Sequence, residues 1–264
     1  MRHLFASEGE AALIATIARR PLLAFDFDGT LAPIVARPDD ARVPVAVELR
    51  LERLSRLLPL AIVSGRRVED VRTRLSFTPQ YIVGNHGAED PWLPQESGST
   101  SPLDGLRDRL AEDAESLRTA GVTVEDKRQS IALHYRLSRQ RARALEVVTR
   151  FTETLPPGLR AFGGKLVMNI VVEGAPDKAA AVASLVERSG ARAAIFLGDD
   201  VNDEPVFARA EPDWLTVKVG RDDPSSRAMY YLDSFSEVAT LLERILSLVT
   251  AGSPERSDSA GGVG

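Results

Sequence analysis

The sequence predicts an α/β protein in which a parallel sheet with helices on both faces is interrupted by a small α+β insertion. Short apolar runs that end in polar or glycine-containing turns alternate with amphipathic helical segments in both the first and the last third of the chain. That alternation is typical of a parallel sheet covered by helices. In between, the order helix, two strands, helix, two strands is typical of a separate α+β unit.

The first third contains three short apolar runs, each followed by a polar turn. Helical apolar spacing predicts a helix over residues 4–19, which Pro21 ends, and continuous apolar runs indicate buried strands. In order, the prediction is helix 4–19, strand 22–25, helix 45–58, strand 60–63, helix 68–75 and strand 81–83.

The pattern changes near Pro91. Residues 91–102 are rich in Pro, Ser and Gly and read as a linker. Beyond it we predict helix 103–117, strands 122–127 and 130–137 as a hairpin, helix 139–155, and strands 159–162 and 166–172.

After Gly174 the first pattern returns. We predict helix 178–188, strand 193–197, helix 204–210, strand 215–219 and helix 236–249. The predicted organisation is therefore a core of residues 1–94 and 174–250, a cap of residues 95–173, and a disordered tail of residues 251–264 that is rich in Gly, Ser and charge.

Composition narrows the chemistry. The chain has 264 residues, of which 44% are hydrophobic and 27% charged, as in soluble globular proteins. A net charge of -5 gives no general attraction to nucleic acid or to an anionic membrane. The absence of cysteine excludes disulfides and thiolate chemistry, and three histidines are few for a multi-histidine metal site. Carboxylates are plentiful, which favours Mg²⁺ as the metal.

No apolar run approaches the roughly 20 residues that span a bilayer, and the N-terminus lacks the pattern of a signal peptide. We therefore expect a cytoplasmic protein that contacts neither membrane nor nucleic acid. A monomer acting on a small molecule is the expected state.

The strongest local signal is Asp26-Phe27-Asp28-Gly29-Thr30, directly after an apolar strand. Ligands bind beyond the carboxyl ends of strands in open α/β sheets. Residues two apart in an extended segment point the same way, so Asp26 and Asp28 can face one substrate. A carboxylate there can attack phosphorus and form an aspartyl-phosphate. The alternative is a strand that simply ends in an Asp-Gly turn.

A second acidic motif, residues 198–204 (Gly-Asp-Asp-Val-Asn-Asp-Glu), also follows an apolar strand and should lie on the same sheet edge. Asp26 and Asp199, together with a backbone carbonyl, could supply the oxygens that Mg²⁺ prefers. The alternative is an acidic helix start that offsets the helix dipole. A helix-loop-helix calcium site fits poorly, because the glycine expected at its sixth loop position is missing.

Two further segments can hold a phosphate. Ser64 and Gly65 end a strand and precede a helix, where a hydroxyl and free backbone N–H groups bind anions, although an ordinary serine cap is the alternative. Lys178 begins a helix, and beside Asp26 it would offset the repulsion between carboxylate and phosphate. Otherwise it is a solvated surface lysine.

The order of these motifs resembles that of the haloacid dehalogenase-like phosphotransferase superfamily. More closely, the chain resembles the trehalose-6-phosphate phosphatases. The matching stretches are residues 26–35, 62–66, 84–89, 125–127, 134–136 and 198–204. The resemblance implies a Rossmann-like three-layer core with an inserted C2-type cap, and Mg²⁺-dependent hydrolysis of trehalose 6-phosphate as the last step of trehalose synthesis.

The resemblance also implies roles for individual residues. Asp26 would be the nucleophile, and Asp28 would protonate the leaving oxygen and then activate water. The phosphoryl group would be held by Thr30, Ser64, Gly65 and Lys178; the metal by Asp26, the Asp28 carbonyl, Asp199 and Asp203; and the sugar by His86, Glu125, Lys127, Arg136 and Asn169.

Three positions depart from the family pattern. Asn169 stands where a glutamate usually binds sugar hydroxyls, Ala179 follows the motif lysine in place of glycine, and Asn202 replaces a usual threonine. An amide cannot supply a charged acceptor. The substrate alternatives are therefore sucrose phosphate or mannosyl-phosphoglycerate, and the alternative class is a non-catalytic sugar-phosphate sensor. A dinucleotide enzyme lacks support, because no Gly-x-Gly-x-x-Gly follows the first strand.

Overall fold

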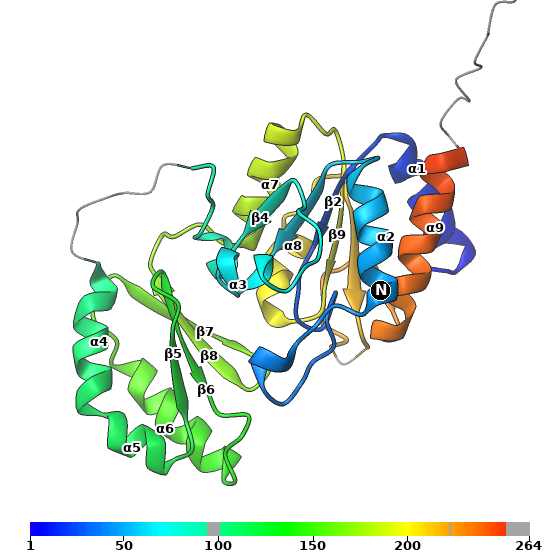
Figure 1. Ribbon diagram of the computed structural model, residues 1–264. Coiled ribbons are helices and arrows are strands. Elements are labelled where there is room, and N and C mark those ends of the chain that lie inside the picture. Colours follow the sequence, from blue (N-terminus) through cyan, green and yellow to red (C-terminus); the bar gives the residue numbers. More distant parts are fainter. Residues whose placement is uncertain (94–100, 222, 252–264) are drawn as a thin grey trace, which may run out of the picture.

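The computed structural model describes residues 1–93, 101–221 and 223–251, and it contains two separate sheets (Figure 1). The larger is a seven-stranded, all-parallel sheet in the order β1-β11-β10-β9-β2-β3-β4. Its strands are β1 (Arg2–His3), β2 (Leu22–Phe25), β3 (Leu60–Val63), β4 (Tyr81–Val83), β9 (Ala194–Gly198), β10 (Leu215–Val219) and β11 (Tyr230–Leu232). The predicted α/β class is confirmed.

Helices cover both faces of this sheet, which explains why β2, β3 and β9 carry no polar side chain. Leu23 and Phe25 of β2 pack into a cluster with the first, second and last helices, whereas Leu22 and Ala24 pack on the opposite face. Side chains alternate between the two faces of a strand, so both faces need apolar residues. The first face carries α1 (Ser7–Ala18), α2 (Val45–Ser55), α3 (Val68–Arg72) and α9 (Val238–Ala251), and the second carries α7 (Lys178–Ser189) and α8 (Glu204–Ala208).

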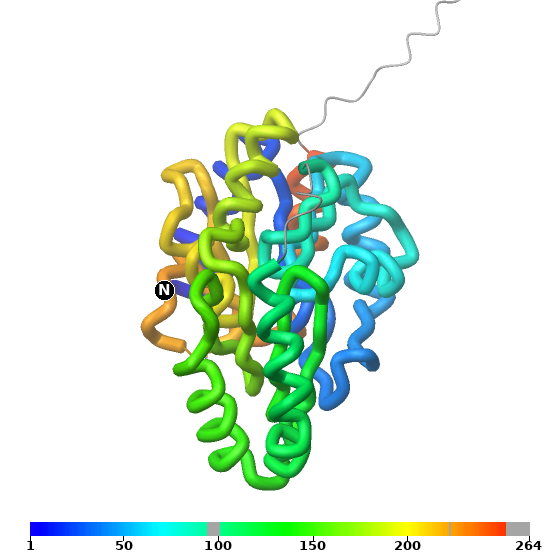
Figure 2. Tube along the Cα trace, turned by 90° about the vertical axis from the view of Figure 1, so that its left-hand side faces the viewer, coloured from blue at the N-terminus to red at the C-terminus, as the bar shows by residue number. Residues whose placement is uncertain are grey.

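The insertion forms a four-stranded antiparallel sheet in the order β5-β6-β8-β7. Its strands are β5 (Thr123–Asp126), β6 (Ser130–His134), β7 (Leu159–Gly164) and β8 (Val167–Val172), and its helices are α4 (Pro102–Glu112), α5 (Ala114–Thr119) and α6 (Arg141–Glu153). The helices pack on one face of the sheet through Ile131, Leu133 and Ile170. In Figure 2 this green insertion fills the lower part of the molecule, beneath the core.

Several details differ from the prediction. The helix expected at residues 103–117 is two helices, α4 and α5, separated at Asp113. The strands β1 and β11 were not predicted, because two and three residues are too short to show a period. The chain before Ser7 therefore belongs to the sheet edge and not to α1.

Two predictions fall largely outside the described residues. The linker predicted at residues 91–102 contains residues 94–100, which lie outside the described ranges. The predicted boundary between residues 94 and 95 falls in the same stretch. The predicted tail contains residues 252–264, which also lie outside the described ranges. Ala251, where the tail was predicted to begin, is the last residue of α9. Within the described ranges, no helix is both long enough and apolar enough to cross a membrane.

The helical layer of the core gives a stability prediction. Leu51 of α2 is fully buried against α9, whereas Leu49 of the same helix is 55% exposed. Leu51→Ala should lower the free energy of unfolding by about 3 kcal/mol because it leaves a cavity. Leu49→Ala should change it by less than about 0.5 kcal/mol. Urea unfolding midpoints measure both, and equal effects would contradict the packing described here.

Candidate active site

A cavity of about 530 Å³ lies between the carboxyl ends of the core strands and the open face of the insertion sheet. Asp26 directly follows β2, and Asp199 directly follows β9, the neighbouring strand. The predicted site residues that line this cavity are Asp26, Asp28, Gly65, His86, Glu125, Lys127, Arg136, Asn169 and Asp199. Stretches far apart in the sequence are thus brought to one cavity, with core and insertion on opposite walls.

Lys178 lies at the floor of the site, between two carboxylates. Its ammonium donates to Asp26 Oδ1 and to Asp203 Oδ1, both at 2.7 Å, and its side chain is only 1% exposed. It is the first residue of α7, whose N-terminus is capped by Asp177 accepting from the Ala180 N–H. The Asp177 side chain fixes where α7 begins and hence where the Lys178 ammonium points. The solvated alternative for Lys178 is excluded.

Asp203 shapes the second acidic loop as well as pairing with Lys178. Its Oδ2 accepts the backbone N–H groups of Asp199 and Asp200 at 2.9 and 3.0 Å. Two glycines are needed for this close fit. A Cβ at Gly198 would lie 2.3 Å from Asp203 Cγ, and one at Gly29, where φ is +83°, would lie 2.0 Å from Asp199 Oδ2.

Asp26, Asp199 and Asp203 form a buried acidic cluster whose oxygens lie within 4.8 Å of one another. Burial raises the pKa of Asp26 well above its ordinary value; Lys178 opposes this effect, and the other two carboxylates add to it. Burial likewise raises the pKa of Asp199 to about 6, against the opposing charge of Lys165. Among the residues that the structure describes, Asp199 Oδ1 is buried without a hydrogen-bond partner. An all-oxygen set with a spare acceptor fits a hard divalent cation, which would offset the excess negative charge.

The carboxylate of Asp28 faces the cavity and is held by Arg66. The guanidinium donates through Nε to Asp28 Oδ2 at 2.6 Å and through Nη2 to Oδ1 at 2.8 Å. It also reaches Asp70 Oδ2 and the Pro38 carbonyl, each at 2.7 Å. The sequence motif contained Arg66 without assigning it a role. Only the fold shows that it orients Asp28 in a two-pronged ion pair.

Of the predicted phosphate-binding residues, some line the cavity and others are buried behind its wall. Ser64 and Thr30 are buried behind the cavity wall; Ser64 Oγ accepts the Arg66 N–H at 3.2 Å, and Thr30 Oγ1 has no partner among the described residues. Gly65 lines the cavity itself. A Cβ at Gly65 would lie 2.3 Å from the His86 ring, so this backbone approach requires glycine.

On the insertion side, Lys127 and Glu125 project from the β5 hairpin toward the core. Lys127 donates to the Gly65 carbonyl at 3.0 Å, and Glu125 Oε2 lies 2.8 Å from His134 Nε2 and 3.6 Å from Lys127 Nζ. Burial lowers the pKa of Lys127. Burial opposes the charge of Glu125, but His134 and Lys127 outweigh it and lower the pKa of that carboxyl. Lys127 is therefore buried at the cavity wall and does not face solvent.

Arg136 joins the insertion to the core through backbone carbonyls. Its Nη1 donates to the Val35 carbonyl at 2.6 Å, and its Nη2 donates to the Lys165 carbonyl at 2.9 Å. Val35 belongs to the core loop that follows the Asp26 motif, and Lys165 lies in the turn between β7 and β8. Arg136 thus lines the cavity wall where the two parts meet.

His86 and Asn169 lie close together in the cavity wall. His86 has φ of +61° and lies edge-on to Phe162, with ring centroids 5.0 Å apart. Burial lowers the pKa of His86 well below its ordinary value, helped by Lys127 and Lys178 and opposed by the neighbouring Asn169 side chain. Asn169 pairs with Phe162 across β7 and β8 and points into the cavity. His86 is therefore a neutral imidazole beside a neutral amide.

Lys165 was not among the predicted site residues. This residue follows two glycines in the β7–β8 turn, and its ammonium lies 2.6 Å from Asp199 Oδ2. Its backbone N–H donates to Asp200 Oδ2 at 3.1 Å. A glycine-rich hairpin turn is a local signal that could have marked the segment, but nothing local indicates contact with an acidic loop 34 residues away.

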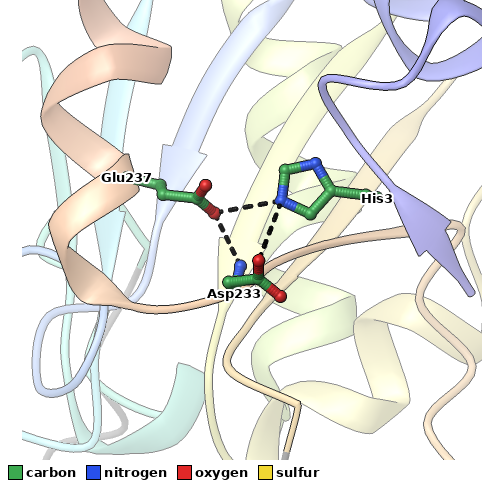
Figure 3. A group of neighbouring side chains, drawn as sticks. All are labelled: His3, Asp233 and Glu237. Atoms are coloured by element: carbon green, nitrogen blue, oxygen red, sulfur yellow. Dashed lines mark hydrogen bonds and ion pairs between the residues drawn. The ribbon is translucent and has the colours of Figure 1, made fainter.

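A second group of potential metal ligands lies beside β1, an edge strand of the large sheet (Figure 3). It consists of His3, Asp233 and Glu237. His3 Nε2 is 3.2 Å from Glu237 Oε2 and 3.7 Å from Asp233 Oδ2. The Phe5 N–H donates to His3 Nδ1, so Nε2 carries the ring proton in the neutral form and donates to Glu237. That proton occupies the position a metal would need. The group is best explained as a clamp between β1 and the turn after β11.

Comparison with known proteins agrees with this geometry. Residues 24–234 match the family model of trehalose-phosphatase. The chain belongs to the trehalose-phosphatase family. The match covers the core motifs and the whole insertion, so both walls of the cavity lie within the family region.

Individual relatives of this family include proteins of Mycobacterium tuberculosis. The chain is 31% identical over 243 residues to a trehalose-phosphate phosphatase, which covers 87% of this chain and 62% of that protein. It is 35% identical over 203 residues to an uncharacterized glycosyl hydrolase, covering 72% of this chain and 15% of that protein. The chain thus spans less than two thirds of the length of each of these relatives.

Among solved structures, the C-terminal domain of the C. albicans trehalose-6-phosphate phosphatase has the same fold. The TM-score is 0.76 at 20% sequence identity, covering 90% of this chain and 96% of that one. The predicted α/β core with an inserted α+β unit is therefore confirmed at the level of the fold.

The buried neutral His86 gives a pH prediction. Its pKa in the folded state lies below the unfolded value near 6.5, so its contribution to stability is present above about pH 6.5 and is lost as the pH falls. The loss is at most about 1.4 kcal/mol per pH unit. His86→Asn should lose less stability between about pH 7.5 and about pH 5.5 than the wild type does. Denaturant unfolding at both values measures this, and parallel losses would contradict it.

Proposed function

We propose that this chain hydrolyses trehalose 6-phosphate to trehalose and phosphate, with Asp26 as a covalent nucleophile. The observation that carries the proposal is the placement of Asp26 at the cavity floor, with Lys178 2.7 Å away and Asp28 at the cavity wall. A buried carboxylate paired to an ammonium can approach a phosphate dianion without the repulsion of an unpaired charge. Membership in the trehalose-phosphatase family supports the substrate class.

The proposed reaction has two displacements at phosphorus. A carboxylate oxygen of Asp26 bonds to phosphorus while the bond to the sugar oxygen breaks, and Asp28, after taking up a proton from solvent, donates it to that oxygen. Arg66, 2.6 Å away, stabilises the carboxylate left on Asp28. Asp28 then takes a proton from water, whose oxygen bonds to phosphorus as the bond to Asp26 breaks. Two moderate steps replace one difficult displacement.

Magnesium is the proposed cofactor. Asp26, Asp199 and Asp203, together with the Asp28 carbonyl, would hold it, in line with the buried acidic cluster and the free Asp199 Oδ1. When bound, it would neutralise charge on the phosphoryl oxygens. Lys178, Thr30, Ser64 and Gly65 are the proposed phosphate-positioning residues.

The insertion is the proposed specificity domain. We assign residues 95–173 to this cap and residues 1–94 and 174–250 to the catalytic core. His86, Glu125, Lys127, Arg136 and Asn169 line the cavity wall and are the proposed contacts to the sugar. The enzyme would act as a cytoplasmic monomer in the last step of trehalose synthesis.

One observation favours a second substrate. The cavity has a neutral amide, Asn169, at its sugar side, and the remaining side chains there are mostly cationic or neutral. An uncharged amide can hydrogen-bond a sugar hydroxyl but does not demand one particular donor pattern. A related phosphorylated sugar, such as sucrose phosphate or mannosyl-phosphoglycerate, is therefore the alternative.

The nucleophile is tested by Asp26→Asn. The amide is nearly isosteric but cannot attack phosphorus, so turnover should fall by at least about 10⁴-fold. Lys178 keeps Asp203 as a partner, so the fold should survive, as a thermal unfolding curve can show. Phosphate release within tenfold of the wild type would exclude the covalent mechanism.

The substrate is tested by phosphate release from a panel of sugar phosphates, with Mg²⁺ and with EDTA. Trehalose 6-phosphate should have a kcat/KM about tenfold or more above sucrose phosphate and mannosyl-phosphoglycerate, and EDTA should abolish turnover. A preference for another sugar phosphate would support the alternative. Tight binding without phosphate release would instead indicate a sensor.

A further inference from the structure

The β7–β8 turn of the insertion reaches across the cavity and sits on the second acidic loop of the core. Lys165 makes the central contact, with its ammonium 2.6 Å from Asp199 Oδ2. The same residue donates its backbone N–H to Asp200 Oδ2 at 3.1 Å. A Cβ at Gly164 would lie 3.0 Å from that oxygen, so the two segments are packed closely.

The contact between the β7–β8 turn and the acidic loop involves backbone atoms as well as the Lys165 side chain. The Lys165 carbonyl accepts from Arg136 Nη2 at 2.9 Å, and the other arm of Arg136 donates to the core carbonyl of Val35. Leu166, the next residue, has φ of +63°, which a non-glycine residue adopts only when its surroundings hold it. The turn is therefore fixed in the position that points Lys165 at Asp199.

Charge balance explains why an ammonium is stable there. Asp26, Asp199 and Asp203 are all buried within one cluster. Lys178 pairs with Asp26 and Asp203 and leaves Asp199 for Lys165. Lys165 thus supplies from the cap the positive charge that a divalent cation would supply from solution.

An ammonium on Asp199 Oδ2 and a divalent cation on Oδ1 of the same carboxylate would repel each other at close range. Mg²⁺ binds carboxylate oxygens at about 2.0–2.1 Å and needs an octahedral shell around it. An ammonium 2.6 Å from the neighbouring oxygen would lie beside that shell. Binding of either cation to Asp199 therefore weakens binding of the other.

We propose that Lys165 is a cap-borne counter-ion that competes electrostatically with the divalent cation for Asp199, so that loading of the cation favours withdrawal of the Lys165 ammonium and the β7–β8 turn. The inference rests on the proposed function only in taking the acidic cluster as the metal site. Metal loading and the position of the cap are then coupled through one carboxylate, and each weakens the other at Asp199.

The chain is well suited to a direct test, because it has four lysines. Lys127, Lys178 and Lys218 are buried, whereas the Lys165 side chain is 34% exposed. An amine-reactive label read by mass spectrometry therefore reports on Lys165, with the N-terminal amine as an internal reference. Adding Mg²⁺ to the full chain, without sugar phosphate, should raise Lys165 labelling several-fold relative to the N-terminus. Unchanged or reduced labelling at saturating Mg²⁺ would overturn the proposal.

Affinity gives the second measurement. Lys165→Met removes the competing charge, so the variant should bind Mg²⁺ or Mn²⁺ about tenfold more tightly than the wild type in calorimetric titration without substrate. The matched control is Arg143→Gln, which removes a positive charge from an exposed position of α6 and should leave the affinity unchanged. Lys165→Gln provides a second variant, and unfolding curves verify that each is folded. Equal or weaker metal binding by folded Lys165 variants would refute the competition.

Phosphate release from trehalose 6-phosphate is measured in parallel, so the two hypotheses fail separately. If the wild type turns over substrate but the Lys165 variants bind metal as the wild type does, only the competition hypothesis is refuted. The expected shifts in affinity and labelling, with no turnover of any sugar phosphate, would support the competition and sink the proposed function.

Discussion

The site depends on one buried ammonium between two carboxylates. Lys178 bonds Asp26 and Asp203 at 2.7 Å each, and all three side chains are removed from solvent. Removing one partner from such a group typically costs about 3–5 kcal/mol, because a charge is left buried and unpaired. Asp203 in turn accepts two backbone N–H groups from the acidic loop. The ammonium therefore connects α7, the end of β2 and the loop after β9 in one electrostatic unit.

The surrounding backbone follows from the need to crowd these groups together. Gly29 and Gly198 lie where any Cβ would collide with Asp199 or Asp203. Gly65 makes the same allowance for the His86 ring. Parallel strands bring their carboxyl ends to one edge, so loops from β2, β3 and β9 meet without long connections. The excess of acid over base that remains leaves a place for an external cation.

The insertion completes the site by contributing cations more than acids. Lys127, Arg136 and Lys165 each reach a core oxygen: the carbonyls of Gly65 and Val35, and the carboxylate of Asp199. The cap is thus attracted to a core edge rich in carboxylates and carbonyls. In the proposed function, Lys127 and Arg136 among these side chains would also contact the sugar phosphate, so substrate binding and cap position would be linked.

The sequence by itself determined the layered core, the inserted α+β unit and the order of the motifs at strand ends, because apolar runs and turn residues are local signals. Only the tertiary structure decided which side chains meet. The strands β1 and β11 have two and three residues and no readable period. Arg66 reaches Asp28 across 38 positions, and Lys165 reaches Asp199 across 34. Such pairings depend on how two sheets are placed against each other, and no local periodicity encodes that placement.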